Sequence, residues 1–83
     1  MSERKREQEG DLIALGHALR ELRLRAGLTQ EAVALRAGMH PAYVSRLERG
    51  HRGVQWLTVR RLLVALEVDL SQLAEAVERA ERD

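Results

Sequence analysis

The side chains in this sequence that could do chemistry are basic, and they lie on one side of a short segment that begins at Pro41. At helical spacing Val44 and Leu47 share one face of this segment, which leaves Arg46 on the opposite face. The small residue Ala42 lies on that opposite face, one turn before the arginine. Small side chains at the leading end let a helix approach base edges closely, and an arginine one turn later can donate to O6 and N7 of a guanine. The segment is therefore typical of a helix that enters a nucleic-acid groove.

Other chemistry has little support in the sequence. The chain has no cysteine, and His17, His40 and His51 are not spaced as metal ligands. No serine, histidine and acid constellation can be proposed, and the glycines form no phosphate-binding loop. The longest apolar run, residues 62–66, is too short to span a bilayer. We therefore expect a protein that is not an enzyme, with no metal, no cofactor, no membrane segment and a cytoplasmic location.

The elements that must position the basic segment can be read from its flanks. Thr29 is a good N-cap for a helix over 30–37, and Gly38 can end that helix in the left-handed region. Pro41 suits the first turn of a second helix, which is expected to cover 41–49 and to end at Gly50. Two short helices joined by a tight turn are therefore expected here.

Three further helices are expected from the leucine spacing, over 11–25, 55–66 and 70–80. The fold class is therefore all-α, a bundle of five helices, in one domain over 11–83. Trp56 is expected to anchor the core from the fourth helix, and the alternative is that it serves as a stacking platform. The charged residues 1–10 have no packing reason to be ordered and are expected to form a disordered tail. The alternative is an arm in which Arg4, Lys5 and Arg6 reach into a nucleic-acid groove.

The net charge of +1 hides a strong division along the chain. Residues 1–19 carry −1, residues 20–61 carry +6, and residues 62–83 carry −4. The positive charge therefore coincides with the two short helices and their flanks, which is the footprint expected of a polyanion binder.

The run from Leu15 to Val68 resembles the helix-turn-helix family of phage repressors and Cro proteins, also called the xenobiotic-response-element family. The similarity is carried by three groups of residues: Gly27, Leu28, Thr29 and Gln30; Ala34 and Gly38; and Ser45, Arg46, Leu47, Glu48, Arg49 and Gly50. One departure is His40, which stands where the family usually has a Ser, Thr or Asp cap. The resemblance implies a repressor-like fold, binding to double-stranded DNA and usually a dimer.

Roles for individual residues follow from the resemblance and from the helix faces. The candidates for base reading are His40, Pro41, Ala42, Ser45 and Arg46, and those for phosphate contacts are Gln30, Tyr43, Arg49, His51 and Arg52. The family also has a salt bridge between its first helix and its recognition helix, which corresponds here to Arg23 and Glu48.

Apolar residues outside the expected core suggest a covered surface, and a homodimer is the expected assembly. The dimer-interface candidates are Leu57, Val64, Leu70, Leu73 and Val77, although the last helix could equally serve the core of its own domain. The sequence thus predicts a DNA-binding transcriptional regulator, either a repressor or a controller of the restriction-modification type, that binds an inverted-repeat operator. No small-molecule ligand is expected. The alternative is a protein-binding helix-turn-helix module, such as an antitoxin or an adaptor, that uses Leu35, Leu57 and Val64.

Overall fold

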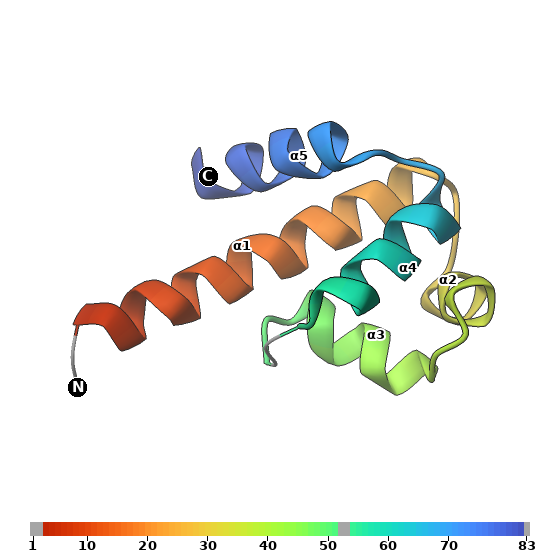
Figure 1. Cartoon of the computed structure of the whole chain (residues 1–83), viewed down its shortest axis with the longest axis horizontal. Helices are drawn as coiled ribbons and strands as arrows, with labels where there is room; N and C mark the ends of the chain where they lie inside the picture. Colours follow the sequence, from red (N-terminus) through yellow and green to blue (C-terminus); the bar gives the residue numbers. More distant parts are fainter. Residues whose placement is uncertain (1–2, 52–53, 83) are drawn as a thin grey trace.

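The computed structural model describes residues 3–51 and 54–82, with side chains from Glu9 onward. The described residues form five helices and no strand, so the predicted all-α fold is confirmed (Figure 1). The helices are α1 (Glu3–Arg25), α2 (Gln30–Ala37), α3 (Pro41–Glu48), α4 (Trp56–Leu66) and α5 (Leu70–Arg82). Helix α5 lies along α1, while α2, α3 and α4 pack together on the other side of α1 (Figure 1).

The first helix is longer than the sequence analysis predicts. It begins at Glu3 and not at Asp11, so the backbone of residues 3–10 is helical where we expected a disordered tail. Extending an existing helix is much easier than starting one, and Glu, Lys, Arg and Gln are all good helix formers. The charged composition of residues 3–9 argued against packing, but it does not argue against continuing a helix. The other four helices agree with their predicted bounds to within two residues.

The turn between α2 and α3 is fixed by local hydrogen bonds at both ends. The Thr29 hydroxyl accepts a hydrogen bond from the Ala32 N–H at 3.0 Å and caps α2. Gly38 ends α2 with a φ of 70°, and the Met39 N–H then donates to the Ala34 carbonyl at 2.9 Å. Glycine is favoured here because a Cβ would be strained at this φ. The reversal therefore takes only three residues.

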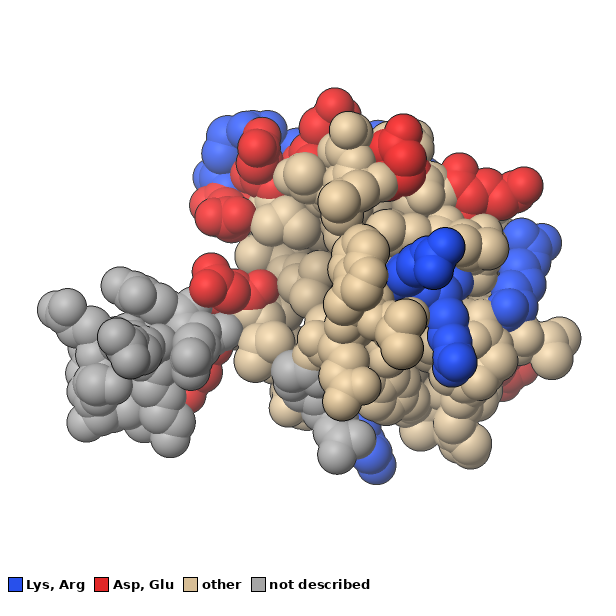
Figure 2. Space-filling view, in the orientation of Figure 1, with Lys and Arg blue, Asp and Glu red and all other residues tan. Residues whose placement is uncertain are grey.

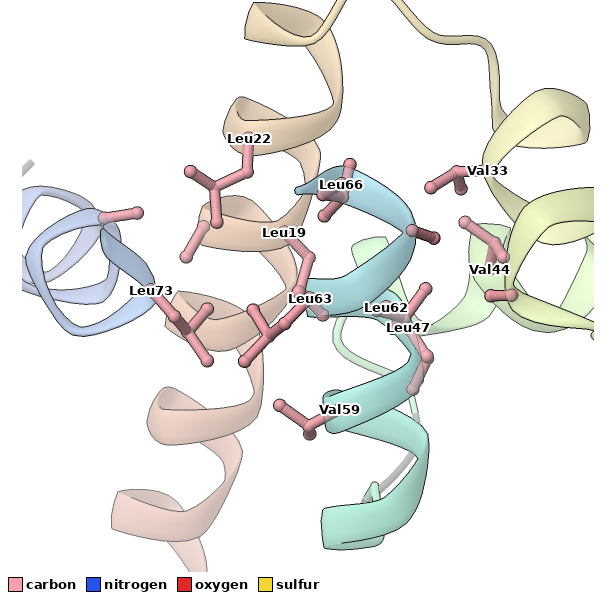
Figure 3. Packing of buried hydrophobic residues seen from close by; sticks show 14 of the residues in the cluster. Leu19, Leu22, Val33, Val44, Leu47, Val59, Leu62, Leu63, Leu66 and Leu73 are labelled. Carbon is pink, nitrogen blue, oxygen red and sulfur yellow. The ribbon is translucent and has the colours of Figure 1, made fainter. Parts of the chain in front are cut away.

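The core is built from leucine, valine and alanine contributed by every helix (Figure 3). Val44 and Leu47 of α3, which helical spacing predicts to face inward, are both buried in this core. The labelled side chains of Figure 3 fill the spaces between α5 and α1, between α1 and α4, and between α4 and the pair α2 and α3. They come from all five helices: Leu19, Leu22, Val33, Val44, Leu47, Val59, Leu62, Leu63, Leu66 and Leu73. Burial of such aliphatic side chains is the main force that holds α3 in place.

Trp56 is not part of this core, so that prediction is wrong. It is the first residue of α4, and its residue surface is 56% exposed. Val54, just before α4, packs against the core, but the first residue of α4 that is buried is Val59. A matching helical phase is therefore not sufficient for burial at a helix end.

Helix α5 starts with a pair of reciprocal hydrogen bonds. The Asp69 carboxylate accepts from the Gln72 N–H at 2.8 Å, and the Gln72 side-chain oxygen accepts from the Asp69 N–H at 2.9 Å. This is a capping box, which satisfies two backbone donors that a helix start leaves unpaired. Leu73 and Ala76 then bury against the core, and Arg79 donates to Glu21 of α1 at 2.9 Å. The last helix is thus anchored to the first.

Candidate nucleic-acid interface

The candidate interface is the outer side of α3. Val44 and Leu47 face the core, whereas Ala42, Arg46 and Arg49 are exposed. Since these three residues are spaced by four and three positions, they lie on one face of the helix. The structure thus brings a small residue and two arginines together on a surface that is open to solvent.

The start of α3 is capped by an unusual residue for this role. The Nδ1 atom of His40 accepts a hydrogen bond from the Ala42 N–H at 3.0 Å. The imidazole therefore does what the hydroxyl or carboxylate of a Ser, Thr or Asp cap would do, and His40 remains exposed. Pro41 occupies the first helical position, where its missing N–H costs nothing.

The other candidates for base reading and phosphate contacts differ in exposure. Pro41, Ser45 and Tyr43 are half-buried, and Tyr43 packs against the core. Arg49 and His51 are exposed at the end of α3, where the His51 N–H donates to the Arg46 carbonyl at 3.1 Å. Arg52, a predicted phosphate contact, lies outside the residues that the structure describes.

The inner end of α3 is held by a buried ion pair. Arg23 of α1 donates through Nε to Oε2 of Glu48 at 2.7 Å and through Nη2 to Oε1 at 2.9 Å, so the pair is bidentate. The side chains of Arg23 and Glu48 are only 9% and 4% exposed. The hydrogen bond to Glu48 raises the pKa of Arg23 above its ordinary value, which outweighs the lowering caused by burial. The predicted contact between α1 and α3 is thus present, with the guanidinium fully charged.

Two further partners of this pair escaped the sequence analysis. Arg23 also donates through Nη1 to the Leu28 carbonyl at 2.9 Å, and the Gln30 side-chain amide donates to Oε1 of Glu48 at 3.0 Å. Gln30, proposed from the sequence as a phosphate contact, therefore binds Glu48 through one amide hydrogen and keeps a second for another acceptor. Nothing in the spacing of Gln30 and Glu48, 18 residues apart, indicates this contact.

A protein-family model described as "helix-turn-helix domain" matches residues 14–76. The matched residues make up more than half of the chain and include the whole of α2, the turn and α3. The chain belongs to this helix-turn-helix family of DNA-binding transcriptional regulators.

Two curated relatives match about 70% of this helix-turn-helix chain. One is the uncharacterized HTH-type transcriptional regulator y4dJ of Sinorhizobium fredii, which is 41% identical over 59 residues, covering 71% of this chain and 77% of the relative. The other is the propionyl-CoA carboxylase regulator of Cereibacter sphaeroides, which is 40% identical over 58 residues. The matched region covers 70% of this chain but spans only 13% of that relative's length.

Solved structures of similar fold include two restriction-modification controller proteins. C.AhdI from Aeromonas hydrophila is 40% identical, with a TM-score of 0.73 over 76% of this chain and 96% of the controller. C.Esp1396I, solved as a tetramer in complex with its natural 35 base-pair operator, has a TM-score of 0.81 at 23% identity. That match covers 88% of this chain and 96% of C.Esp1396I, and at this identity it establishes the shared fold.

The charges of this helix-turn-helix domain are separated in space as well as in sequence. Figure 2 shows acidic side chains along the upper edge of the molecule, over α5, with basic side chains at the left end of that edge, and further basic side chains over α4 on the face toward the viewer. The exposed acidic residues of α5 are Glu75, Glu78 and Glu81, and the exposed arginines of α4 are Arg60 and Arg61. The exposed surface of helix α5 thus carries more acidic than basic side chains, since Arg82 is its one exposed arginine among the described residues.

The dimer-interface candidates fall into two groups. Leu57, Val64 and Leu70 are 61%, 70% and 55% exposed, so they remain open to a second subunit. Leu73 is buried in the core of its own domain, and Val77 packs against that core. The sequence analysis left open whether the stripe on the last helix serves the core or a partner, and within this chain Leu73 and Val77 serve the core.

Among the side chains of residues 9–51 and 54–82, no group of three histidine, aspartate or glutamate residues is arranged to hold a metal ion. In the same part of the chain, none of the five helices combines the length and the apolar composition that a membrane-spanning helix needs.

Proposed function

We propose that this chain regulates transcription as a homodimer that binds an inverted-repeat operator, with α3 of each subunit in the major groove. The observation that carries the proposal is the outer side of α3, where exposed Arg46 follows exposed Ala42 by one turn on a helix whose inner side is buried. Both recognition helices must meet the same side of the duplex, so the two half-site centres are expected about 34 to 36 Å apart.

In this proposal Arg46 is the main base reader. Its guanidinium can donate two hydrogen bonds to O6 and N7 of a guanine, and the Ala42 methyl can contact a thymine methyl. His40, Pro41 and Ser45 lie nearby and contribute less. Gln30, Tyr43, Arg49, His51 and Arg52 are proposed to contact phosphates, which fix the register of the protein on the duplex without reading sequence.

A role as a restriction-modification controller or a short repressor is supported by the 40% identity with the controller C.AhdI, which this chain matches over 96% of the controller's length. The exposed Leu57 and Val64, seven residues apart on α4 and lining one groove, support self-association, because a contiguous exposed apolar patch often marks an interface. Leu70, at the start of α5, is also exposed. We place the dimer contact at these three residues.

One observation favours a second function. Leu35 is 84% exposed, and it lines the same groove between α2 and α4 as Leu57 and Val64. Three arginines, Arg36, Arg60 and Arg61, also line this groove. A groove that combines leucine, valine and arginine side chains also suits a different protein, as in an antitoxin or adaptor, and such a partner would compete with the second subunit for Leu57 and Val64.

Two measurements separate these functions. Selection of duplexes from a randomised library by the purified protein should yield a palindromic consensus, and sedimentation of the free protein should show a dimer. The double variant Leu57→Ala/Val64→Ala should sediment as a monomer and bind the selected duplex more weakly, whereas Glu75→Ala should change neither. A monomer that enriches no sequence would overturn the proposal and favour the protein-binding module.

A further inference from the structure

Helices α1 and α3 approach each other closely at Gly16, a glycine in the middle of α1. A Cβ added to Gly16 would lie 2.4 Å from the Leu47 carbonyl oxygen, 2.7 Å from the Glu48 carbonyl oxygen and 2.9 Å from the Glu48 carbonyl carbon. All three atoms belong to the backbone of α3, so no side-chain rotation can relieve the contact. Ordinary contact begins at about 3.4 Å. Any side chain at Gly16 must therefore push the end of α3 away from α1 by about 1 Å.

A second glycine, just after α3, lies close to the backbone of α1. Gly50 follows α3 with a φ of 72°, and a Cβ there would lie 2.9 Å from Ile13 Cα and 3.1 Å from Ile13 N. Ile13 and Gly16 are three residues apart on α1, so they form one turn of that helix. One turn of α1 and the end of α3 are thus in backbone contact through two glycines.

The ion pair extends this contact along the same side of α1. Gly16 and Arg23 are seven residues apart, which puts them on one face of the helix. Glu48 meets both of them: its carbonyl lies over Gly16, and its carboxylate accepts two hydrogen bonds from Arg23. The backbone contact sets the depth of α3 on α1, and the charged pair sets its direction.

We infer that Gly16, together with Gly50, is a positioning residue for DNA recognition: the missing side chains fix how deep the end of α3 sits and so where Arg46 and Arg49 project. Arg46 immediately precedes Leu47, whose carbonyl touches Gly16. A displacement of the Leu47 backbone by about 1 Å should therefore displace the adjacent Arg46 backbone by about the same distance. Paired hydrogen bonds to a guanine depend on such distances, whereas attraction to phosphates acts over about 10 Å at ordinary salt. The inference rests on the proposed function, because it assumes that α3 reads base edges.

The chain contains its own matched control. Gly10 lies in the same helix, and a Cβ there would meet nothing within 4 Å. Gly10→Ala and Gly16→Ala are thus the same substitution in one helix, but only the alanine at position 16 meets the backbone of α3. Gly10→Ala should melt slightly higher than the wild type, because alanine favours a helix more than glycine does.

The experiment compares the two variants on the duplex that the wild type selects from a randomised library and on a scrambled duplex of the same composition. At a temperature where circular dichroism shows each protein to be fully folded, Gly16→Ala should bind the selected duplex at least about tenfold more weakly and the scrambled duplex within about twofold of the wild type. Gly10→Ala should match the wild type on both. Equal losses on both duplexes, or no loss on either, would overturn the inference.

Two further measurements cover the remaining outcomes. If Gly16→Ala does not fold, the variant Gly50→Asn tests the inference in its place. Asparagine tolerates a positive φ, but its Cβ still meets the Ile13 backbone. We therefore expect Gly50→Asn to lose affinity for the selected duplex and not for the scrambled one. If the wild type selects no sequence, the proposed function fails. A crystal structure of Gly16→Ala then tests the positioning by itself, and it supports the inference only if the end of α3 has moved away from α1 by about 1 Å.

Discussion

The two sides of α3 differ in how firmly they are held. On the inner side Val44 and Leu47 are buried, the backbone touches Gly16, and Glu48 binds Arg23 and Gln30. On the outer side Ala42, Arg46 and Arg49 are exposed, and no ion pair or side-chain hydrogen bond of theirs is seen among the described residues. The helix is thus fixed to the domain by one side and exposed to solvent on the other, which is the side that we propose binds DNA.

This difference separates stability from recognition. Changes on the inner side should lower the free energy of unfolding, and changes on the outer side should alter DNA binding while the fold is unaffected. Small helical domains bury little surface, so a single well-placed contact can carry a large share of their stability. The predictions below test that separation, beginning with the largest expected effect.

Removing the carboxylate of Glu48 should have the largest effect on stability. Glu48→Ala leaves Arg23 charged and buried with no acceptor except the Leu28 carbonyl, and should cost about 3 to 5 kcal/mol in the free energy of unfolding. Urea denaturation followed by circular dichroism measures this loss. The apolar double variant Arg23→Met/Glu48→Leu should recover much of it, and Glu31→Ala, at an exposed position of α2, serves as the control. A loss below about 1 kcal/mol for Glu48→Ala would mean that the pair is not buried in solution.

Arg46→Ala should leave stability unchanged and reduce sequence-specific binding. Loss of paired hydrogen bonds to one guanine should cost about 1 to 3 kcal/mol on the selected duplex and relax the preference at one position. Binding to a set of duplexes, each with one base pair replaced, measures both effects. A uniform loss across all the duplexes would show that Arg46 contacts phosphate instead.

His40→Ala should destabilise the start of α3 by about 1 kcal/mol, because the Ala42 N–H loses the acceptor that caps the helix. The variant His40→Ser should restore the cap through its hydroxyl and return the stability to near the wild-type value. Thermal melts of the three proteins make the comparison. If serine does not recover the loss made by alanine, the imidazole stabilises the turn by some means other than capping.

Arg49→Ala should have the smallest effect. Arg49 is exposed at the end of α3 and is proposed to contact a phosphate, so its removal should weaken binding to selected and scrambled duplexes alike. The slope of log K against log salt should become shallower by about one. Titrations at several salt concentrations measure this slope. Loss on the selected duplex alone would assign Arg49 to base reading.

The sequence was sufficient to predict the parts of the molecule that depend on local signals. Thr29, Gly38 and Pro41 specify the bounds of α2 and the start of α3, and each acts through its own backbone or cap. The inward positions Val44 and Leu47 follow from helical spacing alone. The pairing of Arg23 with Glu48 came from the family resemblance, because no local rule brings together residues that are 25 positions apart.

The features that the sequence did not predict depend on packing between distant segments. The prediction that Trp56 is buried was wrong, because the spacing of apolar residues does not say where a helix end lies relative to the neighbouring helices. The close approach at Gly16 also depends on how α3 crosses α1. One signal was present in the sequence: a glycine lies among the leucines of a strongly helical stretch, where such a residue usually has a packing reason.

The exposure of Trp56 has a practical consequence for spectroscopy. Trp56 is the only tryptophan, and it already meets water in the folded monomer, so its fluorescence should change little when the chain unfolds. The same indole stands on α4 only one position before Leu57, which we assign to the subunit contact. A blue shift of its emission on raising the protein concentration would therefore report assembly directly, without any added label.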